Sequence, residues 1–586
     1  MYKAPPPRPK KTDIVRSRSG CRGCRQRRVK CDEQKPSCRA CVRRGISCEA
    51  ILPSLDFHNV TLSAIESPGG RHCQHLRFKY SQGPPKIDTK NSEQSHLADE
   101  DSRVASLISP PVLATSPSQP LACSEHEAMY LTHWNEACVH ALQHSLRQIS
   151  LATDSHAPFK AALLALSACN LSRSLPERNE LDAQVAYRPN PRHLLSSQQY
   201  YVTAVGQAAR TILRSSLMAP SHTLAMLVLF CNIETAMGNF TGFGCHAQGI
   251  INFIQTHFRA ITKDTLGRGA IATWVLARNH NWWLRMNFSS ASFQLAQPSM
   301  CLPMDMSNVL HSIGSRRATV TSILCETYRL STIAFLHSTL DDAIPSPEID
   351  DCVALMRAES TRLDDWHSTL SQSELPFDSF AEFNTHESSQ FRPLLFTSHR
   401  LAMNYAYYVS SRVLQSMSHP GASETEGSTG DMEIAHWSTA LLRIVAGLDK
   451  QTCARKNVYS IGVSSLLVAC VLRYHSLAFG RWVEKWLLEC HALSIFEEGS
   501  FPIAQAWQVV RLVNEERAAG NYACAIALPE DDGGGRFDRV LLLRREGGSL
   551  RLPWEFVSVN MVEQPSSPSG PGLIGTSNLY RLNYGH

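Results

Sequence analysis

Six of the 19 cysteines in this 586-residue chain lie within 28 residues near its N-terminus. Their spacing, C-x2-C-x6-C-x6-C-x2-C-x6-C, is one C-x2-C-x6-C unit that occurs twice. Thiolates are preferred ligands of structural zinc, which takes four of them. The alternatives are a one-zinc ribbon with two spare cysteines, a metal-storage segment, and a chance pattern. The six cysteines are Cys21, Cys24, Cys31, Cys38, Cys41 and Cys48.

Counting ligands favours two zinc ions. Two tetrahedral ions need eight ligand positions, and six thiolates supply them if two thiolates bridge. Cys21 and Cys38 open the two repeats, so we expect these two to bridge. The segment offers almost no apolar side chains, so metal must hold it together. The first ion would bind Cys21, Cys24, Cys31 and Cys38, and the second would bind Cys38, Cys41, Cys48 and Cys21.

The charge of the chain is strongly asymmetric. Residues 1–48 hold 15 lysines and arginines against three acidic residues, whereas the other 538 residues hold 42 basic and 49 acidic ones. A compact basic segment on a mildly acidic body is typical of nucleic-acid binders. Lysine or arginine also occupies many of the positions between the cysteines, which a metal store would not need. The charge and the cysteines together favour a zinc-dependent nucleic-acid-binding module.

Residues 17–49, SRSGCRGCRQRRVKCDEQKPSCRACVRRGISCE, closely resemble the fungal zinc binuclear cluster (Zn2Cys6) DNA-binding domain. Every cysteine fits the family pattern, as do the basic run RQRRVK, the CD after the third cysteine and the proline of the connecting loop. The resemblance implies the sharing of ligands described above, two Zn²⁺ ions per chain, double-stranded DNA as the partner and a nuclear location.

The resemblance also implies how DNA is bound. The residues after each C-x2-C form a short helix, and the first helix enters the major groove. Arg27 and Arg28 match the family positions that contact bases, typically in a CGG triplet. We expect the remaining basic residues to contact phosphates, which position the protein without specifying sequence. These phosphate-contact candidates are Arg22, Arg25, Lys30, Arg39, Arg43 and Arg44.

Two segments beside the cysteine module have the composition of unstructured chain. Residues 1–16 form a basic arm before the module, which spans 17–50. Residues 51–120 are rich in proline and serine with little periodicity, so we expect a disordered linker. No uninterrupted heptad pattern follows Cys48, so a coiled coil is not expected. A monomer and a homodimer formed by the large domain both stay open.

Residues 121–528 carry apolar residues at three- and four-residue intervals, which predicts a large all-α domain. The segment Phe159 to Arg173 is similar, at the level of pattern, to the all-helical regulatory domain of one branch of the fungal family. That similarity implies a regulatory or effector-sensing role, and the leading hypothesis adds contacts between this domain and the transcription machinery. Residues 529–586 are unassigned, although Val540 to Leu543 resemble a strand. The expected fold is therefore a small Zn2Cys6 domain, a disordered linker and a large all-α regulatory domain.

Several function classes are disfavoured. No apolar stretch is long enough to cross a membrane. The common nucleotide-binding, metalloprotease and hydrolase motifs are absent, which argues against an enzyme fused to the module. An RNA-binding role is less favoured because residues 17–50 contain no Phe, Tyr or Trp to stack on bases. The leading hypothesis is a sequence-specific, zinc-dependent regulator of RNA polymerase II transcription.

Overall fold

The computed structural model divides the chain into two compact units, Met1–Thr115 and Ser116–His586. The structure describes residue 24 and residues 38–44, 125–143, 146–147, 157–174, 189–213, 218–287, 289–340, 347–378, 392–416, 427–528, 539–546 and 554–560. The expected arm at 1–16, the linker at 51–120 and the chain after residue 560 lie outside these ranges. In the first unit, the described residues include one helix, α2 (Arg39–Val42).

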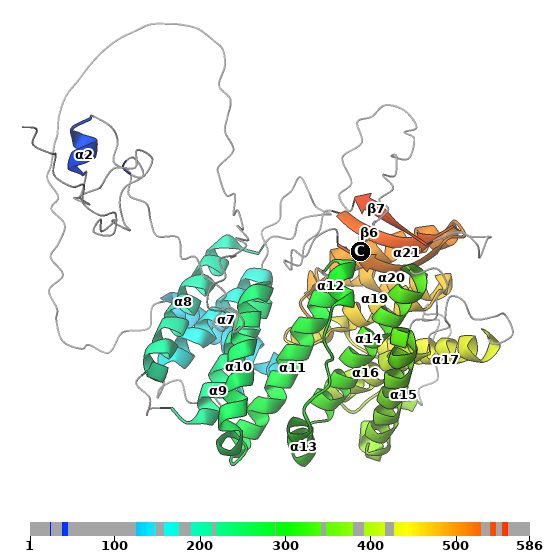
Figure 1. The fold of residues 1–586 in the computed structure, drawn as a ribbon, viewed down its shortest axis with the longest axis horizontal. Helices are drawn as coiled ribbons and strands as arrows, with labels where there is room; N and C mark the ends of the chain where they lie inside the picture. Colours follow the sequence, from blue (N-terminus) through cyan, green and yellow to red (C-terminus); the bar gives the residue numbers. More distant parts are fainter. Residues whose placement is uncertain are drawn as a thin grey trace, which may run out of the picture. The chain divides into compact units, whose positions relative to one another are not determined.

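The second unit is mainly helical (Figure 1). Its helices are α4 (Glu125–His133), η2 (Trp134–Cys138), α5 (Val139–Ala141), α7 (Ala157–Ser174), α8 (Pro191–Leu213), α9 (Pro220–Ala236), α10 (Phe240–Ile261), α11 (Thr265–Asn287), α12 (Ala291–Leu295), α13 (Met304–Ser312), α14 (Arg316–Leu340), α15 (Pro347–Ser368), η3 (Gln372–Glu374), α16 (His399–Gln415), α17 (Gly427–Ala446), α18 (Lys450–Lys456), α19 (Val463–Arg473), α20 (Leu477–Ala492) and α21 (Ile503–Ala518). The prediction of a large helical domain is therefore confirmed.

Two large hydrophobic clusters form the core of this unit. One gathers side chains mainly from α7, α9, α10 and the first half of α11, and the other gathers side chains from α14, α16 and the helices α19 to α21. Helix α11 contributes to both clusters, with Trp274 in the first and Trp283, which is fully buried, in the second. It packs against α9 on one side and α14 on the other (Figure 1). Because α11 buries apolar area in both clusters, it stabilises the packing of one cluster against the other.

The helices in the centre of the core are apolar around most of their circumference. In α19 every residue from Val463 to Arg473 is buried. A helix on the outside is amphipathic instead, and α10 buries Phe243, Ile250, Ile254 and Ile261 at spacings of seven, four and seven residues. These spacings place the four side chains on one face, as the periodicity of three to four residues predicts.

Four cysteines of the helical unit are buried in its core. Cys169, Cys231, Cys325 and Cys470 are each fully inaccessible to solvent. Burial raises the pKa of the Cys169 thiol to about 11 and that of Cys470 to about 12. These thiols are therefore protonated at neutral pH and act as small apolar side chains.

Strands accompany the helices towards the C-terminal end of the unit. Two short antiparallel strand pairs, β1 (Phe377–Asp378) with β2 (Leu394–Leu395) and β3 (Glu497–Glu498) with β4 (Phe501–Pro502), interrupt the helices. A three-stranded antiparallel sheet follows, in the order β5 (Tyr522–Ala527), β6 (Arg539–Arg545) and β7 (Glu555–Asn560).

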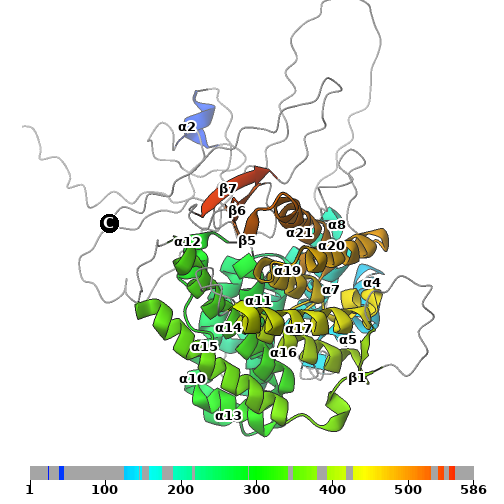
Figure 2. The same cartoon turned by 90° about the vertical axis from the view of Figure 1, so that its right-hand side faces the viewer.

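This sheet lies at one end of the helices, beside α19 and α21 (Figure 2). A boundary at residue 528 would separate β5 from its partner β6, so the folded unit extends at least to Asn560. The unit also contains strands in its core, because Val540 and Leu542 of β6 pack into the hydrophobic cluster formed by α14, α16 and α19 to α21. Among the described residues, no helix is both long and apolar enough to cross a membrane.

Candidate metal centre

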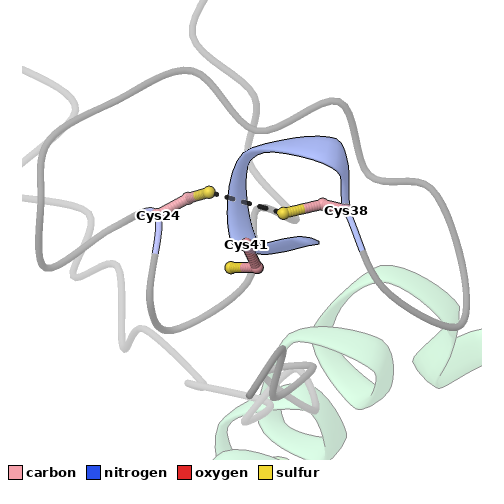
Figure 3. A group of neighbouring side chains, drawn as sticks. All are labelled: Cys24, Cys38 and Cys41. Carbon is pink, nitrogen blue, oxygen red and sulfur yellow. Dashed lines mark hydrogen bonds between the residues drawn. The ribbon is translucent and has the colours of Figure 1, made fainter. Parts of the chain in front are cut away.

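Three of the six cysteines predicted to bind metal are described, and they lie together (Figure 3). The sulfur atoms of Cys24, Cys38 and Cys41 are all within 4.8 Å of one another. The Sγ atoms of Cys24 and Cys38 are 3.6 Å apart. All three side chains are buried, with at most 1% of their surface exposed. Three inward-facing thiols thus form a compact set of soft donors.

The short helix α2 sets the relative position of two of these thiols. Cys38 occupies the N-cap with an extended backbone, and its carbonyl oxygen accepts hydrogen bonds from the backbone N–H groups of Cys41 and Val42, both at 3.0 Å. The C-x2-C spacing therefore becomes one helical turn, which brings the two sulfur atoms to the same side. Cys24 approaches them from a segment 14 residues earlier in the chain.

The geometry fits a thiolate metal site better than a disulfide. Sulfur atoms bonded to each other lie about 2.05 Å apart, far closer than the 3.6 Å between Cys24 and Cys38. Sulfur atoms on one tetrahedral zinc ion, each about 2.3 Å from the metal, lie about 3.8 Å apart. The observed separation is within about 0.2 Å of that value, which is the usual tolerance for a metal site. Cys21, Cys31 and Cys48 lie outside the described residues.

Positive charge lies on the outer side of α2. Arg39, Arg43 and Arg44 are exposed, whereas Cys41, on the same short segment, is fully buried. The helix carries no acidic residue in its first turn. The described part of the module thus has a cysteine side that faces inward and an arginine side that faces solvent. The other five predicted DNA contacts, Arg22, Arg25, Arg27, Arg28 and Lys30, lie outside the described residues.

Comparison with known proteins supports the assignment of this module. Residues 19–56 match the family model of the fungal Zn(2)-Cys(6) binuclear cluster domain, so the match includes all six cysteines. It ends before the helical domain begins. No curated protein and no solved structure matches the chain.

Members of the matched family bind zinc and DNA, regulate transcription and are generally nuclear. The cysteine spacing, the clustered thiols of Cys24, Cys38 and Cys41 and the family match agree with one another. Residues 19–56 therefore form a fungal Zn(2)-Cys(6) binuclear cluster domain.

Proposed function

We propose that this protein is a sequence-specific regulator of RNA polymerase II transcription that works in the nucleus. Residues 17–50 bind double-stranded DNA, and the large helical unit provides regulation and contacts with the transcription machinery. The observation that carries the proposal is the family match over residues 19–56, which coincides with the clustered thiols. The enzyme alternative has less support, because members of the family are transcription factors.

We assign two zinc ions to the six cysteines. The 3.6 Å separation of the Cys24 and Cys38 sulfur atoms supports a shared ion, and the helical turn between Cys38 and Cys41 supports a second ion that Cys38 also binds. Zinc supplies the folding energy of the module, about 10–16 kcal/mol in small zinc peptides. The proposed ligands are Cys21, Cys24, Cys31 and Cys38 for one ion and Cys38, Cys41, Cys48 and Cys21 for the other.

We assign base contacts to Arg27 and Arg28, in the major groove of a CGG-type half-site. An arginine can donate two hydrogen bonds to O6 and N7 of one guanine, which discriminates by about 1–3 kcal/mol against another base. The exposure of the arginines on α2 supports a phosphate-binding role for that helix. The proposed phosphate contacts are Arg22, Arg25, Lys30, Arg39, Arg43 and Arg44.

Selection from a random duplex DNA library with the full-length protein tests this proposal. We expect enrichment of a short GC-rich triplet when zinc is bound and no enrichment after chelation. A single triplet indicates a monomer, and two triplets at a fixed spacing indicate a homodimer. Equal recovery of all sequences by the zinc-loaded protein would contradict the proposed function, as would preferential binding of RNA in a parallel competition.

A further inference from the structure

A cavity of about 540 Å³ lies within the large helical unit. Its walls come from distant parts of the sequence: the segment around η2 and α5, the C-terminal ends of α7 and α9, helix α18, and the β3–β4 hairpin. Its volume falls in the range of about 300–1,000 Å³ that is usual for small-molecule sites. Apolar side chains, including Ala454, Val458 and Ile495, form part of the lining.

An ion pair holds two walls of this cavity together. The guanidinium of Arg173, at the end of α7, donates from Nε and Nη2 to the two carboxylate oxygens of Glu497, at 2.7 and 2.5 Å. It also donates to the carbonyl oxygen of Ala236, at the end of α9. This two-bond geometry is the stronger kind of charged contact. The opposite charges of Arg173 and Glu497 offset each other, and their hydrogen bonds fix the ends of α7 and α9 relative to the β3–β4 hairpin.

The β3–β4 hairpin is a rigid wall rather than a loose loop. Gly499 and Ser500, at the turn of the hairpin, have left-handed backbones, with φ of 62° and 59°, and non-glycine residues rarely adopt this conformation unless their surroundings enforce it. Two buried side chains provide that enforcement. His280 forms a 3.1 Å hydrogen bond with the carbonyl oxygen of Gly499.

The second enforcing side chain is the buried carboxylate of Glu498. It accepts hydrogen bonds from the backbone N–H groups of Val463 and Ser464, at 3.0 and 2.8 Å. It also accepts from the Ser464 hydroxyl at 2.9 Å and from the Asn457 amide at 2.7 Å. The wall is therefore preformed, so that a ligand would not need to order it.

Polar and cationic side chains are among the residues that line this preformed space. The hydroxyl of Tyr459 is buried beside the Cys138 thiol and has no well-formed hydrogen bond among the described residues. Lys456, at the exposed end of α18, forms no salt bridge within the described part of the chain, and Arg455 donates to the Gln451 carbonyl of its own helix. Arg455 and Lys456 are both exposed, so their cationic groups can meet an incoming anion, whereas the Tyr459 hydroxyl is sealed from solvent.

The charges of the lining select the class of ligand. The charges of Arg173 and Glu497 offset each other within their ion pair. Among the other lining residues, Arg455 and Lys456 carry positive charge and Glu136 carries the single negative charge. We propose that this cavity binds a small organic anion with an apolar body, whose carboxylate or similar acidic group lies near Arg455 and Lys456 and whose apolar body lies against Ala454, Val458 and Ile495. This proposal does not depend on the zinc module.

Titration of the full-length protein with anilinonaphthalene sulfonate, a fluorescent anion with an apolar body, tests the site. We expect one saturable site per chain, and competition by small carboxylic acids. The double variant Arg455→Met/Lys456→Met should weaken binding by about tenfold or more, because it removes the charged contacts. The matched control, Arg481→Met/Lys485→Met, replaces two exposed cations of α20 outside the lining and should change binding by less than about twofold.

Two further variants separate a local site from general attraction of anions. Ala454→Phe fills the lining and should abolish binding while circular dichroism stays unchanged. Tyr459→Phe should change binding by less than about twofold, since the hydroxyl that it removes is sealed from solvent. Chelation of zinc should leave the titration unchanged, which separates failure of this proposal from failure of DNA binding. Equal losses in the charge variant and its control, undiminished binding to a folded Ala454→Phe protein, or equal affinity for the neutral analogue phenylnaphthylamine would overturn the proposal.

Discussion

Replacement of Cys38 by alanine should remove both zinc ions, whereas replacement of Cys24 should remove one. The Sγ atoms of Cys24 and Cys38 are 3.6 Å apart, close to the separation of about 3.8 Å expected for two thiolates on one tetrahedral zinc ion. Cys38 also lies one helical turn from Cys41, so it can serve a second ion. A bridging thiolate supplies one of four ligands to each of two ions, and a terminal thiolate supplies one ligand to a single ion.

The magnitude follows from the small size of the module. Structural zinc contributes about 10–16 kcal/mol to the folding of such peptides, more than the whole stability of a typical domain. We therefore expect the zinc content of the Cys38→Ala protein to fall from two ions per chain to nearly none. Its affinity for the specific DNA site should decrease by about 10³-fold or more. Native mass spectrometry and elemental analysis of the purified protein measure the zinc content directly. Retention of close to two ions by Cys38→Ala would refute the sharing of ligands.

Three other predictions concern DNA contacts and the helical unit. Arg28→Ala should cost about 1–3 kcal/mol on the selected site and relax its base preference, whereas Arg43→Ala should weaken all sequences alike and reduce the salt dependence; fluorescence anisotropy at several salt concentrations distinguishes the two. Glu498→Gln should lower the free energy of unfolding, measured by urea denaturation, by about 3 kcal/mol, because an amide nitrogen would face buried donors. The same measurement on the exposed control Glu515→Gln should show a decrease of less than about 0.5 kcal/mol. Burial lowers the pKa of His280 to about 4, so the unfolded chain binds a proton that the folded chain does not as pH falls from about 6.5 towards 4. Stability should therefore decrease over that range, and His280→Gln should remove up to about 1.4 kcal/mol per pH unit from the slope of unfolding free energy against pH.

The metal centre could be predicted from sequence because its chemistry is local. Six cysteines in 28 residues predict a candidate ligand set without any knowledge of the fold. The turn from Cys38 to Cys41 follows from the C-x2-C spacing, and the structure places these two sulfur atoms beside that of Cys24. The assignment of individual ligands and DNA contacts remains a prediction, since half of the cysteines lie outside the described residues.

The helices were predictable where their apolar periodicity is regular. The expected helix from Phe159 to Arg173 is α7 (Ala157–Ser174), with small differences at its ends. The helical segment that begins at Glu125 is interrupted, because the structure has a π-helical turn at Trp134–Cys138 and an extended residue at Leu142. Periodicity cannot show such a break, because the apolar side chains on both sides of it still face the core.

Features built from distant segments could not be predicted. The strand character of β6 is visible in its residues, but its pairing with β5, such as Ala527 opposite Leu541, depends on a contact across an intervening segment. The cavity is a stronger case, because its central ion pair joins Arg173 to Glu497, 324 residues later. Neither residue has a neighbour in sequence that indicates a site.

The most direct test of the central claim is a measurement of DNA affinity with zinc bound, removed and restored. Fluorescence anisotropy of the full-length protein would use a duplex that carries a CGG triplet and a control duplex with the triplet scrambled. We predict that the zinc-loaded protein prefers the CGG duplex, that chelation abolishes the preference, and that added zinc restores it. Equal affinity for both duplexes, or a preference that survives complete removal of zinc, would contradict the account.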